Sequence, residues 1–466
     1  MELWRRSARE LAHLIASRQV TSREVVEAHL QRIDEVNPHL TAVVRRLDDE
    51  ARASADAADA AVRRGDPLGP LHGVPFTFKE NIDVAGTPTT NAIPALAEAY
   101  SSTDAPVVER MRAAGGVVLA RTNLPDMGLR IHTDSSLHGL TRNPWAPDRT
   151  AGGSSGGEGS ALASGMSPIG LGNDIGGSLR NPAHCCGIAS IKPTQGVIPG
   201  ATEIPPTASS LAFQLMASEG VMARRVADVR MGFDIVRGRH VRDPYSVSAD
   251  LADVPTNRPW RVAVMDVPPG GATDRGIAAG VRAAADALAR AGHDVRTATP
   301  PDFEEVTTMW ASTLNADLVV NRPLLEAVMG EDAKTFLGYG ISEFPVLDEA
   351  GLALLHLRRF EVAAKWAEWF GEFDVMLSPT WALPAFTHGF DVAGIEQARV
   401  VLETFRTVLP MNLFGSPAAV VPAHIADGLP VGVQVSAWRF DDLKCLTVAQ
   451  AIDETLGIST PIDPCR

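Results

Sequence analysis

The chain has 466 residues, of which 45% are hydrophobic and 21% are charged, and its formal net charge is −14. This composition favours a globular protein with a large core over a disordered chain, and the acidic balance disfavours nucleic acid as a partner, because phosphate binding needs clustered Lys and Arg. Four cysteines without zinc-ligand spacing and an N-terminus without an apolar h-region predict a reduced, cytoplasmic protein that has neither a signal peptide nor a membrane span.

The first part of the chain is predicted to be helical. Apolar side chains recur at helical spacing across residues 7–64, in two or three helices, and Thr21 followed by Glu24 is a capping-box signature for the second helix. A short strand is expected at residues 72–79, where apolar and polar side chains alternate.

Strands and helices alternate further along, which favours a parallel or mixed sheet. The stretch from Asp253 to Trp260 contains prolines and is a candidate linker, although the strands on both sides can belong to one sheet. The other expected elements are a helix end at 109–114, strands at 117–120, 261–267, 293–299 and 373–378, a buried helix around 160–164, helices at 273–291 and 443–456, and a hairpin of 418–421 and 431–435 around residues 427–430.

The most distinctive segment runs from Ala151 to Gly196 and places Ser154 and Ser178 among many glycines. Glycine is useful where the backbone must bend sharply or approach a ligand closely, so backbone amides are expected to form part of a site. Each serine is then a candidate nucleophile beside an oxyanion hole. The expected oxyanion donors are the backbone N–H groups of Ile175, Gly176, Gly177 and Ser178.

Three motifs carry a resemblance to a known family. They are GVPFTFKENIDV around Lys79, GGSSGGEGSALASG around Ser154 and GNDIGGSLRNPAHCCGIASIKPTQG around Ser178. These motifs resemble the signature of the amidase signature family of serine hydrolases, and their spacings, 75 and 24 residues, match that family too. The likeness extends over most of the chain and is loosest between residues 200 and 400.

The resemblance implies a single α/β domain over residues 1–466, with a twisted mixed β-sheet covered by helices on both faces. Residues 1–64 would form N-terminal helices, 70–200 the signature core, and 201–466 the substrate pocket and the rest of the sheet. It assigns Ser178 as the nucleophile, Ser154 as a bridging serine after a cis Gly153–Ser154 peptide, and Lys79 as the base, without metal or cofactor.

Lys79 must be uncharged to accept a proton. The reference pKa of a lysine is about 10.4, so the site has to lower the pKa of Lys79 by roughly 2–3 units for work near neutral pH. Glu80 stands where the family more often has aspartate, and strand alternation points it to the face opposite Lys79.

Other residues near the serines are given supporting or structural roles. Ser155 is expected to support the site by hydrogen bonding, and Asp174 and Arg180 to form an ion pair that holds the glycine loop. His184, Cys185 and Cys186 are interpreted as packing residues, because no further ligands stand at metal spacing. The candidate lining of an acyl pocket is Met127, Trp310, Phe336, Trp381 and Phe386.

Two rival interpretations start from glycines. Residues 152–156 satisfy G-x-S-x-G, the nucleophile elbow of an α/β-hydrolase esterase that would use Ser154, but that motif needs a preceding strand and NPWAPDR is a loop sequence. Gly170, Gly172 and Gly176 approach a dinucleotide fingerprint, with the spacing off by one.

A third alternative lies within the family, namely a glutaminase-type subunit of a complex that transamidates charged tRNA. We rank a free-standing amidase, monomeric or homodimeric, above it. The sequence leaves the substrate open, because amides, aryl amides, esters and carbamates (urethanes) all present a carbonyl with a leaving group.

Overall fold

One sheet of 11 strands runs through the computed structural model, which describes residues 2–251, 254 and 258–465. The strand order is β1-β3-β2-β6-β8-β7-β12-β13-β11-β9-β10, and a small separate pair is formed by β4 and β5. The strands are β1 (Val43–Arg46), β2 (Pro75–Lys79), β3 (Val117–Thr122), β4 (Asp134–Ser135), β5 (Gly139–Leu140), β6 (Ile169–Asp174), β7 (Ala189–Lys192), β8 (Ser218–Ala223), β9 (Arg261–Val264), β10 (Asp294–Thr297), β11 (Val375–Pro379), β12 (Ala418–Ala426) and β13 (Leu429–Ser436).

The sheet is mixed in direction. Parallel pairing joins β2 to β3 and to β6, and also joins β9 to β10 and β11. The strands from β6 to β11 in the middle of the sheet are antiparallel neighbours. This arrangement confirms the predicted α/β fold with a mixed sheet.

Both faces of the sheet are apolar. In β9, Val262 and Val264 belong to one core cluster and Ala263 belongs to another, because successive side chains of a strand point to opposite faces. The two clusters need cover on both sides, and helices supply it.

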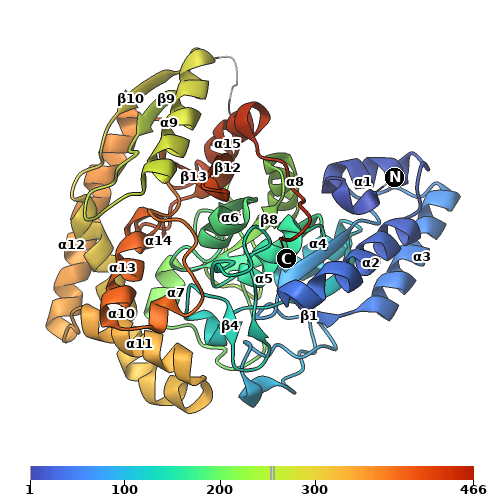
Figure 1. Cartoon of the computed structure of the whole chain (residues 1–466), viewed down its shortest axis with the longest axis horizontal. Helices are drawn as coiled ribbons and strands as arrows, with labels where there is room; N and C mark the ends of the chain where they lie inside the picture. The colour runs from blue at the N-terminus through green and yellow to red at the C-terminus, as the bar shows by residue number, and fades with distance from the viewer. Residues whose placement is uncertain (1, 252–253, 255–257, 466) are drawn as a thin grey trace.

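Figure 1 shows α1–α3 at one end of the molecule and α10–α12 at the other, with α5 and α6 between them. The helices are α1 (Ala8–Ala16), α2 (Ser22–Leu40), α3 (Asp48–Arg64), α4 (Pro106–Ala113), α5 (Gly156–Ala163), α6 (Arg180–Cys186), α7 (Leu211–Met216), α8 (Val226–Val236), α9 (Arg275–Arg290), α10 (Phe303–Val328), α11 (Glu331–Glu343), α12 (Glu349–Glu372), α13 (Ile395–Thr404), α14 (Leu409–Leu413) and α15 (Asp442–Leu456), with short 3-10 turns that include η3 (Asp126–Gly128) and η4 (Phe390–Val392).

Most of the expected elements are present within a few residues of their predicted bounds. The capping box of Thr21 and Glu24 is confirmed, as is the buried small-residue helix, α5. The hairpin turn is shorter than predicted, because Leu429 and Pro430 already pair with β12 and leave only residues 427–428 as the turn. The candidate linker lies partly outside the described residues, and the strands on either side of it, β8 and β9, belong to one sheet.

Candidate active site

Lys79 and Ser154 meet at the end of β2, an interior strand of the sheet. Lys79 is the last residue of β2 and is fully buried, and its Nζ lies 2.7 Å from Ser154 Oγ. Ser154 lies just before α5, after a cis Gly153–Ser154 peptide, which confirms the peptide geometry that the family resemblance implies.

Steric contact explains the glycines around Ser154. A Cβ atom at Gly153 would lie 2.5 Å from the carbonyl carbon of Ile131, and one at Gly157 would lie 2.3 Å from the backbone nitrogen of Asn123. Neither neighbour is the end of a flexible side chain, so no larger residue fits without moving the backbone. Packing against these two segments therefore fixes the position of the Ser154 loop.

Ser178 lies in the loop between β6 and α6, next to the loop of Ser154. The N–H of Ser155 donates to the carbonyl of Ser178 at 3.2 Å, which ties the two serine loops together. Ser178 is 7% exposed and Ser154 is 2% exposed, so the predicted nucleophile is the more accessible of the two serines. The structure thus brings Lys79, Ser154 and the loop of Ser178 into one place.

Only some of the backbone N–H groups that are predicted to form the oxyanion hole can bind an oxyanion. Among the described residues, those of Ile175, Gly176 and Ser178 donate to no acceptor. The N–H of Gly177 instead donates to Asp174 Oδ1 at 2.8 Å. Because a backbone amide has a single proton, Gly177 has to be removed from the predicted oxyanion donors.

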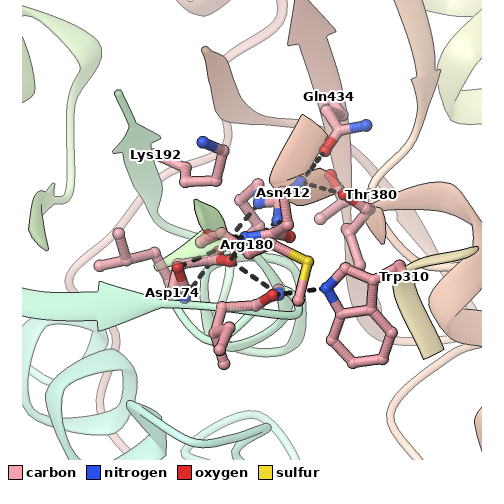
Figure 2. A network of polar contacts seen from close by, with 12 residues as sticks. Asp174, Arg180, Lys192, Trp310, Thr380, Asn412 and Gln434 are labelled. Atoms are coloured by element: carbon pink, nitrogen blue, oxygen red, sulfur yellow. Dashed lines mark hydrogen bonds and ion pairs between the residues drawn. The ribbon is translucent and has the colours of Figure 1, made fainter. Parts of the chain in front are cut away.

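A buried ion pair between Asp174 and Arg180 supports the Ser178 loop. Arg180 Nη2 donates to Asp174 Oδ1 and Arg180 Nε to Asp174 Oδ2, each at 2.9 Å, and both side chains are fully buried. Asn412 Nδ2 donates to the same carboxylate at 3.0 Å, and Arg180 Nη1 donates to Gln434 Oε1 (Figure 2). The predicted structural ion pair is confirmed.

The ion pair also fixes the charge of Asp174. Burial by itself raises the pKa of this carboxyl, but the charge and hydrogen bonds of Arg180 outweigh burial and hold the pKa below its usual range. Asp174 is therefore a permanent anion that is matched by its own cation.

Burial lowers the pKa of Lys79 to about 7, while the negative charges of Glu219 and Asp174 act in the opposite direction. The size and the direction of this shift are those that a neutral base near pH 7 requires. Glu80 has no part in it, because its carboxylate accepts from His138 Nε2 and Thr90 Oγ1 in a separate buried cluster. Lys79 and Glu80 thus point away from each other, as strand alternation predicts.

The role predicted for the Ser155 hydroxyl is not supported. Its Oγ is buried and has no hydrogen-bond partner among the described residues, whereas its backbone N–H makes the contact with Ser178. Any contribution of Ser155 to the site therefore comes from its backbone and its size.

Two of the predicted pocket residues border the Ser178 loop. Trp310 Nε1 donates to the carbonyl of Ile175 at 2.9 Å, and the Trp310 ring lies beside Gly176. Trp381 lies beside Gly177, and Phe405 contacts both tryptophans, with ring centroids 6.4 Å and 5.0 Å away. The two tryptophan rings thus border the loop, and the Phe405 ring packs against both of them.

The other three predicted pocket residues lie in different places. Met127 belongs to η3, beside Gly128, where an added Cβ would lie 3.4 Å from Ser154 Oγ. Phe336 lies in α11 within the same core cluster as Trp310. Phe386 packs at the edge of that cluster, against His132 and Phe390.

Sequence reasoning missed three polar residues around Lys79. Lys79 Nζ donates to Asn173 Oδ1 at 2.6 Å, and Asn173 Nδ2 donates to Asn81 Oδ1 at 3.1 Å. Glu219 of β8 is the third, since its charge acts on Lys79. Asn81 and Asn173 lie inside the quoted motifs, so the sequence could have identified them, but only the strand pairing brings in Glu219.

The rival interpretations do not fit the fold. In the described chain no strand leads into Ser154, since residues 141–155 contain only isolated bridges, so the nucleophile elbow is excluded. Gly170 and Gly172 lie inside β6 rather than in a turn that opens a helix. His184 Nδ1 accepts from the Gly432 N–H, and no cluster of metal-binding side chains occurs among the described residues.

The fold and this arrangement define a hydrolytic α/β enzyme with candidate catalytic serines in a glycine-rich loop. Comparison with known proteins agrees, because residues 24–446 match the amidase family. The chain belongs to the amidase family and is an amidase, a hydrolase that acts on the C–N bond of amides.

Named relatives of the chain are amide hydrolases too. The chain is 39% identical to an indoleacetamide hydrolase of Bradyrhizobium diazoefficiens, with 98% of this chain and 87% of that protein covered. It is 34% identical to an acylamidase of Rhodococcus erythropolis, with 95% and 94% covered. The solved structure of 6-aminohexanoate cyclic dimer hydrolase complexed with substrate superposes with a TM-score of 0.85 at 29% identity and covers 98% of both chains.

No helix in the described part of the chain is both long and apolar enough to cross a membrane.

Proposed function

We propose that this amidase cleaves small amides through an acyl-enzyme on Ser178, with Ser154 as the proton relay and Lys79 as the base. The contact between the buried Lys79 Nζ and Ser154 Oγ at 2.7 Å carries the proposal. A serine hydroxyl is a weak nucleophile until a base takes its proton, and a lysine held near its neutral form is such a base.

In acylation, the neutral amine of Lys79 takes the proton of Ser154 while Ser154 Oγ takes the proton of Ser178. Ser178 Oγ then bonds to the carbonyl carbon, and the N–H groups of Gly176 and Ser178 bind the negative oxygen. The proton returns through Ser154 to the leaving nitrogen as the C–N bond breaks. Lys79 is then neutral again, and an amine departs.

Water completes the cycle by the same route. It bonds to the acyl carbon and gives a proton to the Ser154–Lys79 relay, and this proton passes to Ser178 as the ester bond breaks. A carboxylic acid leaves and both serines are restored. Neither half of the cycle requires a metal or a cofactor.

We propose amides with an apolar or aromatic acyl group as the substrate class, because Trp310 and Trp381 border the Ser178 loop and Phe405 packs against both rings. The names of the relatives, an indoleacetamide hydrolase and an acylamidase, agree with this class. Aryl amides, esters and urethanes present the same carbonyl and are further candidates. No observation on the described residues favours the glutaminase-type alternative.

The first experiment is active-site labelling with a fluorophosphonate, followed by peptide mapping. We expect one adduct, on Ser178, with no labelling of Ser178→Ala and slow labelling of Ser154→Ala. An adduct on Ser154 would overturn the assignment. Values of kcat/KM for aliphatic amides, anilides, esters and aryl carbamates would then rank the substrate classes.

A further inference from the structure

Asn173 of β6 and Glu219 of β8 are directly opposite each other in the antiparallel pair of strands. Directly opposed residues carry their side chains on the same face of a sheet, close enough to interact. The Asn173 carboxamide accepts from Lys79 at 2.6 Å, so it stands between the lysine and the glutamate. Lys79, Asn173 and Glu219 therefore form a row across three adjacent strands, β2, β6 and β8.

In the described part of the chain, Glu219 is a carboxylate without an ion-pair partner. Its Oε2 is buried without a hydrogen-bond partner among the described residues, and no ion pair there includes its carboxylate. Asp174, the other carboxylate that acts on Lys79, is already matched by Arg180. A buried and unpaired carboxylate is costly, so the nearest cation gains most from its charge.

We propose that Glu219, acting through Asn173, is a positioning residue that sets the protonation state of Lys79. The proposal rests on the base role proposed above for Lys79. When Glu219 carries a proton, the neutral amine is favoured, and when it is ionised, it stabilises the ammonium that forms as Ser154 gives up its proton. Glu219 therefore affects both the fraction of Lys79 that is neutral and the basicity of the Lys79 amine.

The titration of the pair is consistent with this balance. Burial raises the pKa of Glu219 to about 7, close to the pKa of Lys79, so the two groups titrate together. Lys79 faces Glu219 and Asp174, and Glu219 faces Lys79, Asp243 and Asp83.

The test substitutes Glu219→Gln, which keeps the size of the side chain and removes its charge. Loss of the negative charge should lower the pKa of Lys79 by about one unit. The acid limb of the kcat/KM profile should move down by the same amount. Plateau kcat should fall several-fold with KM unchanged, because a weaker base loses the stabilisation of its ammonium form.

The lysine can be observed directly, because the chain contains only Lys79, Lys192, Lys334, Lys365 and Lys444. NMR of protein labelled with ¹³C at lysine Cε follows each titration, and the signal missing from Lys79→Arg identifies Lys79. Lys192 is a matched internal control, since burial lowers its pKa to about 7 as well and Glu219 does not contribute to that shift.

A downward move of the Lys79 midpoint with Lys192 unmoved supports the inference. An unmoved Lys79 midpoint, or equal moves of both lysines, overturns it. If the Lys79 midpoint moves and the kcat/KM limb does not follow, Glu219 acts as inferred and the base role of Lys79 fails instead. The wild-type protein gives a second test if the variant does not fold, since coupling broadens the Lys79 curve beyond that of a single proton.

Discussion

Lys79 Nζ and Ser154 Oγ lie 2.7 Å apart although 75 residues separate them in the chain. The contact is buried, and the strand end that holds Lys79 is fixed by β3 on one side and β6 on the other. A proton can pass between these two groups without any movement of the backbone.

The acid limb of activity should report Lys79. Because burial lowers the pKa of Lys79 to about 7, the amine is protonated and inactive below that pH. We expect kcat/KM for a neutral amide to rise about tenfold per pH unit below the limb and to level off above it. Activity that is independent of pH from about 5 to 8 would contradict a lysine base.

Ser154 and Ser155 should behave differently although they are neighbours. Ser154→Ala removes the hydroxyl in contact with Lys79, and we expect kcat to fall by about 10²–10⁴-fold. Ser155→Ala removes a hydroxyl that has no hydrogen-bond partner among the residues that the structure describes, and it should change kcat only a few-fold. Steady-state kinetics of both variants, with thermal melts to check folding, give the comparison. Equal losses would contradict the relay.

Gly176 should not tolerate alanine. The new Cβ would lie 2.7 Å from Trp310 Cζ2, and the hydrogen bond from Trp310 to Ile175 holds that ring in place. We expect a loss of about 1–3 kcal/mol in the free energy of unfolding and about 10²-fold in kcat as the loop shifts. Gly338→Ala in α11 is the matched control, since its Cβ would meet nothing within 4 Å. Partial recovery of Gly176→Ala by Trp310→Leu would identify the clash as the cause.

Arg180→Met should be strongly destabilising, because it leaves the buried charge of Asp174 without its ion-pair partner. A loss of about 3–5 kcal/mol in the free energy of unfolding is expected. The control is Arg358→Met, which removes a solvent-exposed pairing with Glu305 and should cost at most about 1 kcal/mol. Urea unfolding measures the loss for each variant. Losses of similar size would contradict a larger contribution of the buried ion pair to stability.

Local patterns in the sequence predicted much of the fold. The capping box at Thr21, the hairpin around Gly428 and the unit of β9, α9 and β10 all depend on residues that are close together in the chain. Strand β6 was missed because Gly170 and Gly172 suggest a turn. The reason for Gly170 lies elsewhere, since an added Cβ there would lie 1.8 Å from Glu158 Oε1.

Site residues that lie in the motifs were predictable from the sequence, whereas residues that only the fold brings together were not. Lys79, Ser154 and Ser178 were found by their motifs and spacing. The use of the Gly177 N–H by Asp174 could not be foreseen, because a glycine-rich sequence does not say which amides are already bonded. Glu219 lies 140 positions after Lys79 and was not predicted, because only the pairing of β6 with β8 brings it near.

Lys79, the last residue of β2, and Glu80, which follows it, are both fully buried, and their side chains belong to separate polar clusters. Because side chains alternate along a strand, deletion of one residue just before Lys79 would place the Glu80 carboxylate beside Ser154. Insertion of one residue there would instead place the Lys79 amine beside His138. The register of β2 therefore determines which charged group lies beside Ser154. Either change would take the amine away from Ser154, although the chain would keep Lys79, Ser154 and Ser178.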